Sequence, residues 1–252
     1  MTYCIGLSLE QGLILASDSR TNAGVDDVRR NGKMRVYVSE GERMIVTLSS
    51  GNLSLTQNAV NLLEHRAAHD PQRPGIGNAR SMFEVAQHVG DALREIRTRD
   101  AAYLRDSGVD PNGSFIVGGQ IRGEAPRLFL VYSEGNFIES SPETPYFQTG
   151  ESKFGKPILD RVISPRTSMT EACKCVLVSF DSTMRSNLSV GPPLDLLLYR
   201  RDSFNANLKQ RLEEDDPYLH TVRTEWNETL RRGVRDLPGR SVSFHSVRTV
   251  CR

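Results

Sequence analysis

The sequence predicts an α+β fold in which strands and helices form separate layers, with a helical extension at the C-terminal end. The expected elements follow one another as strands, two helices, strands, two helices, one strand and a tail, rather than as alternating β-α-β units. The chain has 252 residues, 38% hydrophobic and 25% charged, which is typical of a globular protein. No internal repeat or linker divides it. We therefore predict one main domain over residues 1–204 and an extension over residues 205–252 that packs on it.

The first fifty residues predict a series of strands. Tyr3 to Leu9 alternates in polarity, a Glu10-Gln11-Gly12 turn follows, and Leu13 to Ala16 is a short apolar run. These segments predict a hairpin whose first strand begins beside Thr2. After a polar loop over residues 21–32, two further strands are expected at 34–38 and 44–48, joined by a turn at 39–42.

The rest of the chain predicts helices on either side of a second group of strands. Leu53 to Ala68 reads as one helix, and a second is clearer because apolar residues from Met82 to Ile96 are spaced by 3, 1, 3, 4 and 3. Strands are expected at 115–119, 128–132, 137–138 and 194–199, and helices at 152–163 and 169–180. The tail from Asn205 to Arg232 is expected to be helical, with Leu219, Val222, Trp226 and Leu230 on one face, and Ser241 to Arg252 to be unstructured.

Charge and cysteine content exclude several classes of protein. The 32 Lys and Arg residues nearly balance 31 Asp and Glu residues, and a net charge of +1 argues against a nucleic-acid partner. Four cysteines are too few for a disulfide scaffold, which indicates a reducing compartment. No apolar run approaches the roughly 18 residues of a membrane span, and the first residues lack a signal peptide. We expect a cytoplasmic protein with no membrane partner.

Thr2 is the first candidate for chemistry. Methionine is commonly removed before a small second residue, so Thr2 is expected to become the N-terminus. Its hydroxyl would then be a nucleophile, and its free α-amine, with a pKa of roughly 7.7–8.0, could accept the hydroxyl proton. The alternative is that Thr2 has no role, as in many chains that begin Met-Thr.

Three other residues become candidates for the same site when they are considered together with Thr2. Asp18 follows a buried strand and the hairpin brings it near Thr2, although a turn aspartate that bonds its own backbone is the plainer alternative. Lys33 precedes a strand, where a solvated lysine is the alternative. Next to Thr2, its ammonium would lower the pKa of the hydroxyl, and Asp18 would keep it charged. Gly51 is either a turn glycine or a backbone N–H donor to an oxyanion.

The combination resembles the β-subunits of the proteasome family, which are threonine N-terminal-nucleophile hydrolases. Four features match in order and approximate spacing: Met-Thr before a strand, Ser-Asp-Ser-Arg at 17–20, Lys33-Met34, and Ser50-Gly51 followed by a helix with Thr56-Gln57. The resemblance covers roughly residues 2–200. Within the family, the segments Thr-Tyr-Cys-Ile-Gly-Leu at 2–7 and Asn-Leu-Ser-Val-Gly-Pro-Pro at 187–193 look most like the bacterial ancestral β-subunit homologues.

The resemblance implies a four-layer αββα sandwich, no cofactor and no metal. It implies Thr2 as nucleophile, Lys33 and Asp18 as the residues that tune it, Gly51 as the oxyanion donor and Ser189 as a supporting residue. It also implies a homo-oligomer, either a closed ring or an open helical assembly, acting on peptides or proteins. The expected activity is that of a threonine-type peptidase. Two alternatives stay open: an amidase acting on a small molecule, and a catalytically silent assembly subunit.

Two positions depart from the family pattern. Gly150-Glu151-Ser152 stands where the family has Gly-Ser-Gly, and Ser186 stands where the family has an aspartate three residues before the serine at 189. The network that orients the Thr2 amine therefore differs in this chain. Asp181 is a candidate substitute for the missing aspartate.

Other signals are weaker. His65 and His69 share a helix face as metal ligands can, but no third ligand is visible, and a solvated face is preferred. Cys173 and Cys175 point in opposite directions on a helix, which predicts one core residue and one incidental residue. Gly118-Gly119 indicates close backbone packing. The cluster of Arg94, Arg97 and Arg99 is offset by nearby acids, which favours a solvated face over a nucleic-acid surface.

Overall fold

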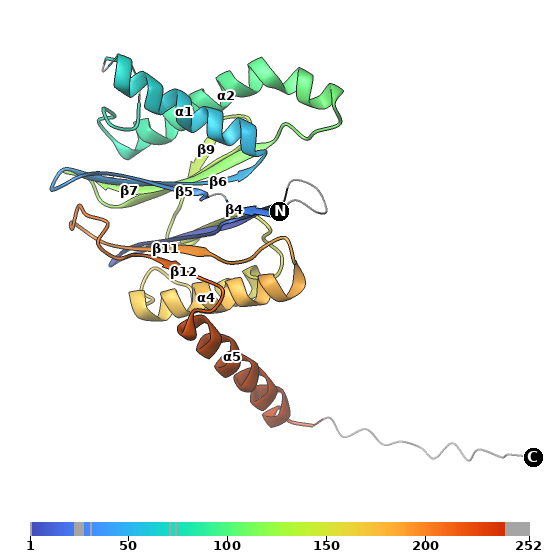
Figure 1. Ribbon diagram of the computed structural model, residues 1–252. Helices are drawn as coiled ribbons and strands as arrows, with labels where there is room; N and C mark the ends of the chain where they lie inside the picture. The colour runs from blue at the N-terminus through green and yellow to red at the C-terminus, as the bar shows by residue number, and fades with distance from the viewer. Residues whose placement is uncertain (1, 23–27, 31, 71, 74, 240–252) are drawn as a thin grey trace, which may run out of the picture.

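Two antiparallel sheets pack face to face, and helices cover the outer face of each (Figure 1). The structure is a computed structural model that describes residues 2–22, 28–30, 32–70, 72–73 and 75–239. Helices α1 (Leu53–His69) and α2 (Met82–Asp106) lie on one sheet. Helices α3 (Lys156–Val162) and α4 (Met169–Ser186) lie on the other. The predicted α+β class with separate layers is confirmed.

The first sheet has the strand order β10-β1-β2-β11-β12. Its centre is the predicted hairpin, in which Cys4 pairs with Ser17 and Leu9 with Gly12. Both faces of this sheet are covered, so β1 and β2 are apolar along almost their whole length rather than alternating. The strands are β1 (Tyr3–Leu9), β2 (Gly12–Asp18), β10 (Tyr146–Gly150), β11 (Leu194–Arg200) and β12 (Lys209–Leu212).

The second sheet is a meander with the order β5-β6-β7-β8-β9. Its longest pairing joins β6 and β7 from Arg43 opposite Ile121 to Gly51 opposite Gly113. The strands are β5 (Met34–Ser39), β6 (Arg43–Gly51), β7 (Gly113–Ile121), β8 (Arg127–Val131) and β9 (Phe137–Glu139). The end of β6 and the start of β7 therefore lie side by side, at Gly51 and Gly113.

The core has three apolar layers. Between the two sheets lie buried side chains such as Leu15, Val46 and Leu128. One outer layer joins the second sheet to α1 and α2, and the other joins the first sheet to α3 and α4. Each fully buried aliphatic or aromatic side chain stabilises the fold by about 1.5–3 kcal/mol before entropy is counted, so this layering holds both sheets rigidly.

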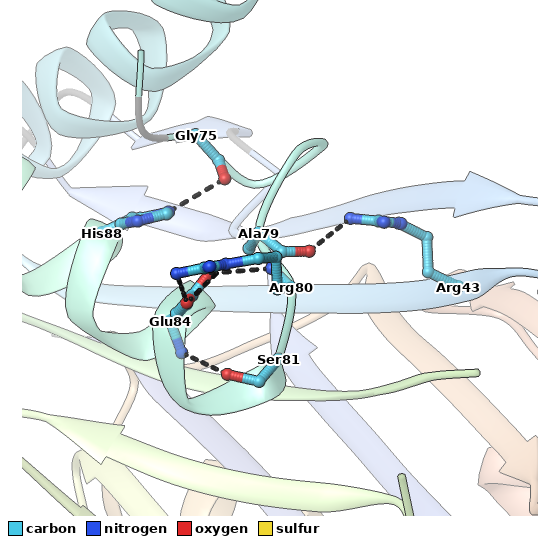
Figure 2. Close-up of polar contacts among 7 residues, drawn as sticks. All are labelled: Arg43, Gly75, Ala79, Arg80, Ser81, Glu84 and His88. Atoms are coloured by element: carbon cyan, nitrogen blue, oxygen red, sulfur yellow. Dashed lines mark hydrogen bonds and ion pairs between the residues drawn. The ribbon is translucent and has the colours of Figure 1, made fainter. Parts of the chain in front are cut away.

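Polar contacts pin the connection between α1 and α2 (Figure 2). The Ser81 hydroxyl accepts a backbone N–H of the first turn of α2 and so caps that helix. Arg43 of β6 donates to the carbonyl of Ala79 at 2.9 Å, and the His88 ring meets the carbonyl of Gly75 at 3.0 Å. These contacts tie the connecting segment to the sheet on one side and to α2 on the other.

Three parts of the chain differ from the sequence prediction. The strand β10 was not predicted, because its five residues carry weak periodicity and are held by pairing with β1. The polar loop over 21–32 contains part of a small hairpin, β3 (Arg20–Asn22) with β4 (Val28–Arg30). The helix expected from Asn205 was wrong at its start: Lys209–Leu212 pairs with β11, and α5 (Pro217–Asp236) begins later.

The physical reason for the last difference is local. Pro217 stands in the first turn of α5, and Asp216 accepts the N–H groups of Tyr218 and Leu219, so this cap fixes where the helix begins. The expectation for Ser241 to Arg252 lies outside the described residues. Within the described part of the chain, no helix combines the length and the hydropathy needed to cross a bilayer.

Candidate active site

Thr2 lines a cleft to which strand ends of both sheets contribute. The cleft has a volume of about 720 Å³. Thr2 lies just before β1, and its carbonyl accepts the N–H of Glu151 at 2.6 Å, which ties it to the end of β10. The residues lining the cleft are Thr2, Ser50, Gly51, Asn52, Asp110, Asn112, Gly113, Ser114, Tyr132, Ser133, Glu134, Thr149 and Gly150. Thr2 and Gly51 are far apart in the sequence, yet both line this one cleft.

Asp18 and Lys33 form a buried ion pair behind Thr2. The Lys33 ammonium donates to Asp18 Oδ1 at 2.6 Å and to the carbonyl of Arg20 at 2.7 Å. The same Asp18 oxygen accepts the N–H of Tyr3 at 2.9 Å. Because Tyr3 follows Thr2 directly, the pair is fixed to the backbone next to the candidate nucleophile, as the hairpin geometry predicts.

Burial dominates the electrostatics of this pair. Asp18 is fully buried and the Lys33 side chain is 5% exposed. Burial raises the pKa of the Asp18 carboxyl above its usual value, while the Lys33 ammonium and its hydrogen bond oppose that rise. Burial also raises the pKa of the nearby Cys4 thiol, so Cys4 is neutral at physiological pH. The Lys33 ammonium is linked to the backbone beside Thr2 through Asp18 Oδ1, which also accepts the Tyr3 N–H.

Two glycines bring backbone close to the site. Gly51 ends β6 with φ +93°, and a Cβ there would lie 2.4 Å from the carbonyl oxygen of Asn112. Gly150 ends β10 with φ +87°, and a Cβ there would lie 2.0 Å from the carbonyl oxygen of Thr2. Any other residue would clash with backbone in a conformation that L side chains avoid, so both positions need glycine.

A cluster of three hydroxyls joins the two sheets inside the cleft. Ser50 lies 2.7 Å from Thr149 and 3.0 Å from Ser114, oxygen to oxygen, and Ser114 lies 2.5 Å from Thr149. Ser50 and Thr149 are buried. This cluster could not be predicted from the sequence, because its members come from β6, β7 and β10 and only sheet packing brings them together.

Ser189 is connected to Thr2 through two intermediate residues. Its N–H donates to Asn187 Oδ1 at 3.0 Å, and Asn187 Nδ2 donates to Glu151 Oε2 at 3.0 Å. Glu151 is buried, and its own N–H bonds to Thr2. Glu151 and Asn187 were not predicted as site residues, although the departure from the family pattern at Glu151 was the available signal.

Comparison with solved structures places the chain in a family. Anbu, the ancestral β-subunit, from Yersinia bercovieri matches with 46% identity and a TM-score of 0.89, covering 95% of this chain and 99% of that one. Anbu from Hyphomicrobium sp. strain MC1 matches with 44% identity and a TM-score of 0.88, over 95% and 100% of the two chains. The chain belongs to the Anbu family.

A third similar Anbu structure is that of an assembly. It is described as the helical assembly of the Anbu complex from Pseudomonas aeruginosa, and matches with 43% identity and a TM-score of 0.90 over 96% of this chain and 99% of that one. No family model and no curated protein matched the chain. The predicted resemblance to bacterial ancestral β-subunits is confirmed.

Asp181 does not serve the site in the way the sequence suggested. Its carboxylate accepts from Arg223 of α5 at 2.8 Å and lies 3.9 Å from Arg185. These contacts hold α4 to α5 and turn the carboxylate toward the extension. Ser186, at the position of the family aspartate, is exposed.

The weaker candidates have structural explanations. His65 and His69 stack with ring centroids 4.1 Å apart, and the His69 ring bonds to the carbonyl of His65. The described residues hold no group of three or more potential ligands for a metal ion. Cys175 is buried and Cys173 half-buried, as expected, while Cys251 lies outside the described residues.

The structure also agrees with the simpler interpretations of the Gly118-Gly119 pair and of the arginine cluster on α2. A Cβ on Gly119 would lie 2.3 Å from the carbonyl oxygen of Met44, which confirms close backbone packing. Arg94 pairs with Asp91, Arg97 with Glu134 and Arg99 with Asp100. The arginine cluster is thus neutralised on the outer face of α2.

Proposed function

We propose that the chain is a threonine-type hydrolase that cleaves amide bonds in peptides or proteins, with Thr2 as nucleophile after removal of Met1. The observation that supports this is the convergence of Thr2 and Gly51 on one cleft, with the Asp18–Lys33 pair fixed behind Thr2. We also propose that the layered fold is the αββα sandwich of N-terminal-nucleophile hydrolases. The protein would be cytoplasmic and would need no cofactor.

In the proposed reaction, the Thr2 hydroxyl oxygen attacks the amide carbonyl and its proton passes to the free α-amine of Thr2. The Gly51 N–H stabilises the developing oxyanion. The C–N bond then breaks as the α-amine returns its proton to the leaving amine, which leaves an ester on Thr2. Water attacks this ester and loses a proton to the α-amine. The C–O bond to Thr2 then breaks as the α-amine returns that proton to the Thr2 oxygen, which releases the acid and the free enzyme.

The roles of Lys33 and Asp18 follow from charge. A buried ammonium beside the hydroxyl favours its deprotonated form and so lowers the pKa of the nucleophile. Asp18 holds that ammonium charged and in place, although its own carboxylate is costly to bury. Ser189 would act more remotely, by holding Asn187 and through it Glu151 against Thr2.

We propose that the protein works as a homo-oligomer, by analogy with the helical assembly of the Pseudomonas aeruginosa relative. A catalytically silent assembly subunit is the second candidate, and the exposed Ser186 favours it because no aspartate stands at that position. A small-molecule amidase is a third, since the cleft volume lies within the range of ordinary ligand pockets.

The test is hydrolysis of a peptide library and of a panel of small N-acyl amides, read by mass spectrometry. Wild-type protein and Thr2→Ala are compared after equal treatment. Products that form only with the wild type support the proposal, and their class separates a peptidase from an amidase. Equal hydrolysis by both proteins, or none by either, would overturn the mechanism and favour the assembly role.

A further inference from the structure

The cleft that contains Thr2 is lined by polar residues and glycines. None of its described lining residues is an alanine, valine, leucine, isoleucine, methionine or phenylalanine, and Tyr132 supplies the one aromatic ring among them. Ligand pockets in proteins are more often lined by hydrophobic and aromatic side chains, with only a few polar groups. This cleft therefore suits a polar occupant better than an aliphatic one.

The charged side chains of the cleft are all acidic. Asp110 and Glu134 carry them, and the described lining includes no lysine, arginine or histidine. The whole chain has a net charge of +1, so the negative character belongs to the cleft and not to the protein in general. A cleft lined by one sign of charge raises the local concentration of ligands of the opposite sign. We therefore expect a cationic occupant.

Asp110 is held close to Gly51, the proposed oxyanion donor. Asn52 follows Gly51 and donates from Nδ2 to the Asp110 carbonyl at 3.3 Å and from its backbone N–H to the Asn112 carbonyl at 2.7 Å. The Asp110 side chain is exposed, and within the described part of the chain its carboxylate has no hydrogen bond or ion pair. Its charge is thus available to an occupant that lies beside the reacting amide.

Glu134 adds a second carboxylate from the turn between β8 and β9. The turn is closed by the N–H of Gly135, which donates to the Tyr132 carbonyl at 2.9 Å. Glu134 Oε1 lies 3.4 Å from Arg97 Nη1, and the Glu134 side chain is 64% exposed. Ion pairs this exposed are weakened by water and salt. Arg97 therefore offsets the charge of Glu134 only in part.

The hydroxyl cluster of Ser50, Ser114 and Thr149 offers acceptors to the same space, because all three residues line the cleft. Each hydroxyl has one proton and two lone pairs. The three oxygens lie within hydrogen-bond distance of one another, so a closed ring of bonds uses every proton and one lone pair of each oxygen. The remaining lone pairs need donors from an occupant. A lysine ammonium offers three donors and an arginine guanidinium five, and neither group accepts.

We propose that this cleft binds the side chain of a lysine or arginine next to the cleaved bond of the peptide substrate. Asp110 supplies the main counter-charge and Glu134 the second, while the hydroxyl cluster accepts N–H bonds from the same side chain. The inference rests on the proposed peptidase function and names the substrate residue that the site selects.

The first test is cleavage of a peptide library by the full chain, with the cut sites read by mass spectrometry. We expect lysine and arginine to be enriched at one position beside the cleaved bond. Three synthetic peptides then carry lysine, norleucine or glutamate at that position, because norleucine keeps the aliphatic chain of lysine without its charge. The kcat/KM for the lysine peptide should exceed that for the norleucine peptide about 25-fold, the product of about 5-fold from each of two exposed ion pairs.

Variants of the two acids test the assignment. Asp110→Asn should lower the ratio of kcat/KM for the lysine peptide to that for the norleucine peptide about 5-fold. Asp106→Asn is the matched control, because it changes the net charge equally but lies at the end of α2, outside the described lining of the cleft, and it should leave the ratio unchanged. Asp110→Lys combined with Glu134→Lys should transfer the preference to the glutamate peptide, which a loss of folding would not do.

The outcomes separate this inference from the proposed function. Cleavage without a preference for basic residues overturns the inference alone, and so does a ratio that Asp110→Asn leaves at the wild-type value. A wild-type protein that cleaves no peptide of the library overturns the peptidase function and this inference with it. Labelling of Thr2 by an electrophile reports separately on the nucleophile.

Discussion

Replacing Lys33 with methionine removes the positive half of the buried pair and leaves the Asp18 carboxylate without a counter-charge. In the wild type, Nζ and Oδ1 lie 2.6 Å apart, with side-chain exposures of 5% for Lys33 and 0% for Asp18. Breaking a pair buried to this degree costs about 3–5 kcal/mol, because the remaining charge stays desolvated. We expect Lys33→Met to lower the free energy of unfolding by about that amount at pH 7.

The size of this loss should depend on pH. Burial already raises the pKa of Asp18, and without Lys33 the pKa of the carboxyl rises further. The folded variant then binds a proton that the unfolded chain does not, so its stability increases as the pH falls from the folded-state pKa toward the unfolded-state value. The gain is up to about 1.4 kcal/mol per pH unit, and the difference from wild type narrows accordingly.

The assay is urea unfolding of both proteins at equal protein concentration, at pH 7 and at pH 5, since association would otherwise shift the apparent stability. Asp18→Asn combined with Lys33→Met should recover part of the loss. Lys156→Met is the matched control, because Lys156 pairs with Asp160 at 2.9 Å with both side chains about half exposed, and such pairs contribute about 0.5 kcal/mol or less. A loss below about 1 kcal/mol that does not change with pH would refute the reasoning.

Four further outcomes are expected. Gly150→Ala should destabilise the fold by about 1–3 kcal/mol in urea and abolish labelling of Thr2, because the added Cβ meets the Thr2 carbonyl in a strained conformation. Thr149→Val should cost about 1–3 kcal/mol, measured in the same way, because it removes the hydroxyl that both Ser50 and Ser114 contact and leaves those two only their bond to each other. The rate of Thr2 labelling should fall on acidification first as the Thr2 α-amine, with a pKa of roughly 7.7–8.0, is protonated. A second fall, from protonation of Asp18 and release of Lys33, should come at a higher pH than an ordinary aspartate would impose, because burial raises the pKa of Asp18. Cys175, whose pKa burial raises to about 11, should resist iodoacetamide at neutral pH in the folded protein and react in urea.

Each of these four has an outcome that would contradict it. Labelling of the Gly150 variant at the wild-type rate would show that the close approach to Thr2 is not needed. An unchanged urea midpoint for the Thr149 variant would mean that the hydroxyl cluster adds nothing. A labelling rate with no second fall below the titration of the α-amine would separate Asp18 from the nucleophile. Rapid alkylation of folded Cys175 would show that the α4 side opens readily.

Much of the fold was predictable because burial leaves a periodic trace in the sequence. The β1–β2 hairpin and helix α2 were predicted from apolar runs and spacing, and the structure confirms both. β10 carried too little pattern in five residues, since its partner β1 lies more than 130 residues away and supplies the pairing. β12 sits in a polar stretch in which only Leu212 is buried, so composition could not separate it from the helix that follows.

The candidate site also contains residues whose positions could be predicted from the sequence and residues whose positions could not. The hairpin brings Asp18 beside the first strand over a short chain distance, so its position near Thr2 could be expected from sequence. The hydroxyl cluster could not, because three separate strands contribute one member each. Asp181 failed as a substitute because its nearest cation, Arg223, comes from an extension that the family comparison in sequence did not cover.

The most direct measurement for the proposed chemistry is the intact mass of the purified protein, with and without a β-lactone or an epoxyketone, followed by peptide mapping. An epoxyketone is informative because it needs both the hydroxyl and the free α-amine of an N-terminal threonine. The account predicts a mass that lacks Met1 and a single adduct on Thr2, with no adduct on Thr2→Ala. A chain that keeps Met1, or one that loses Met1 and forms no adduct on Thr2, would contradict it.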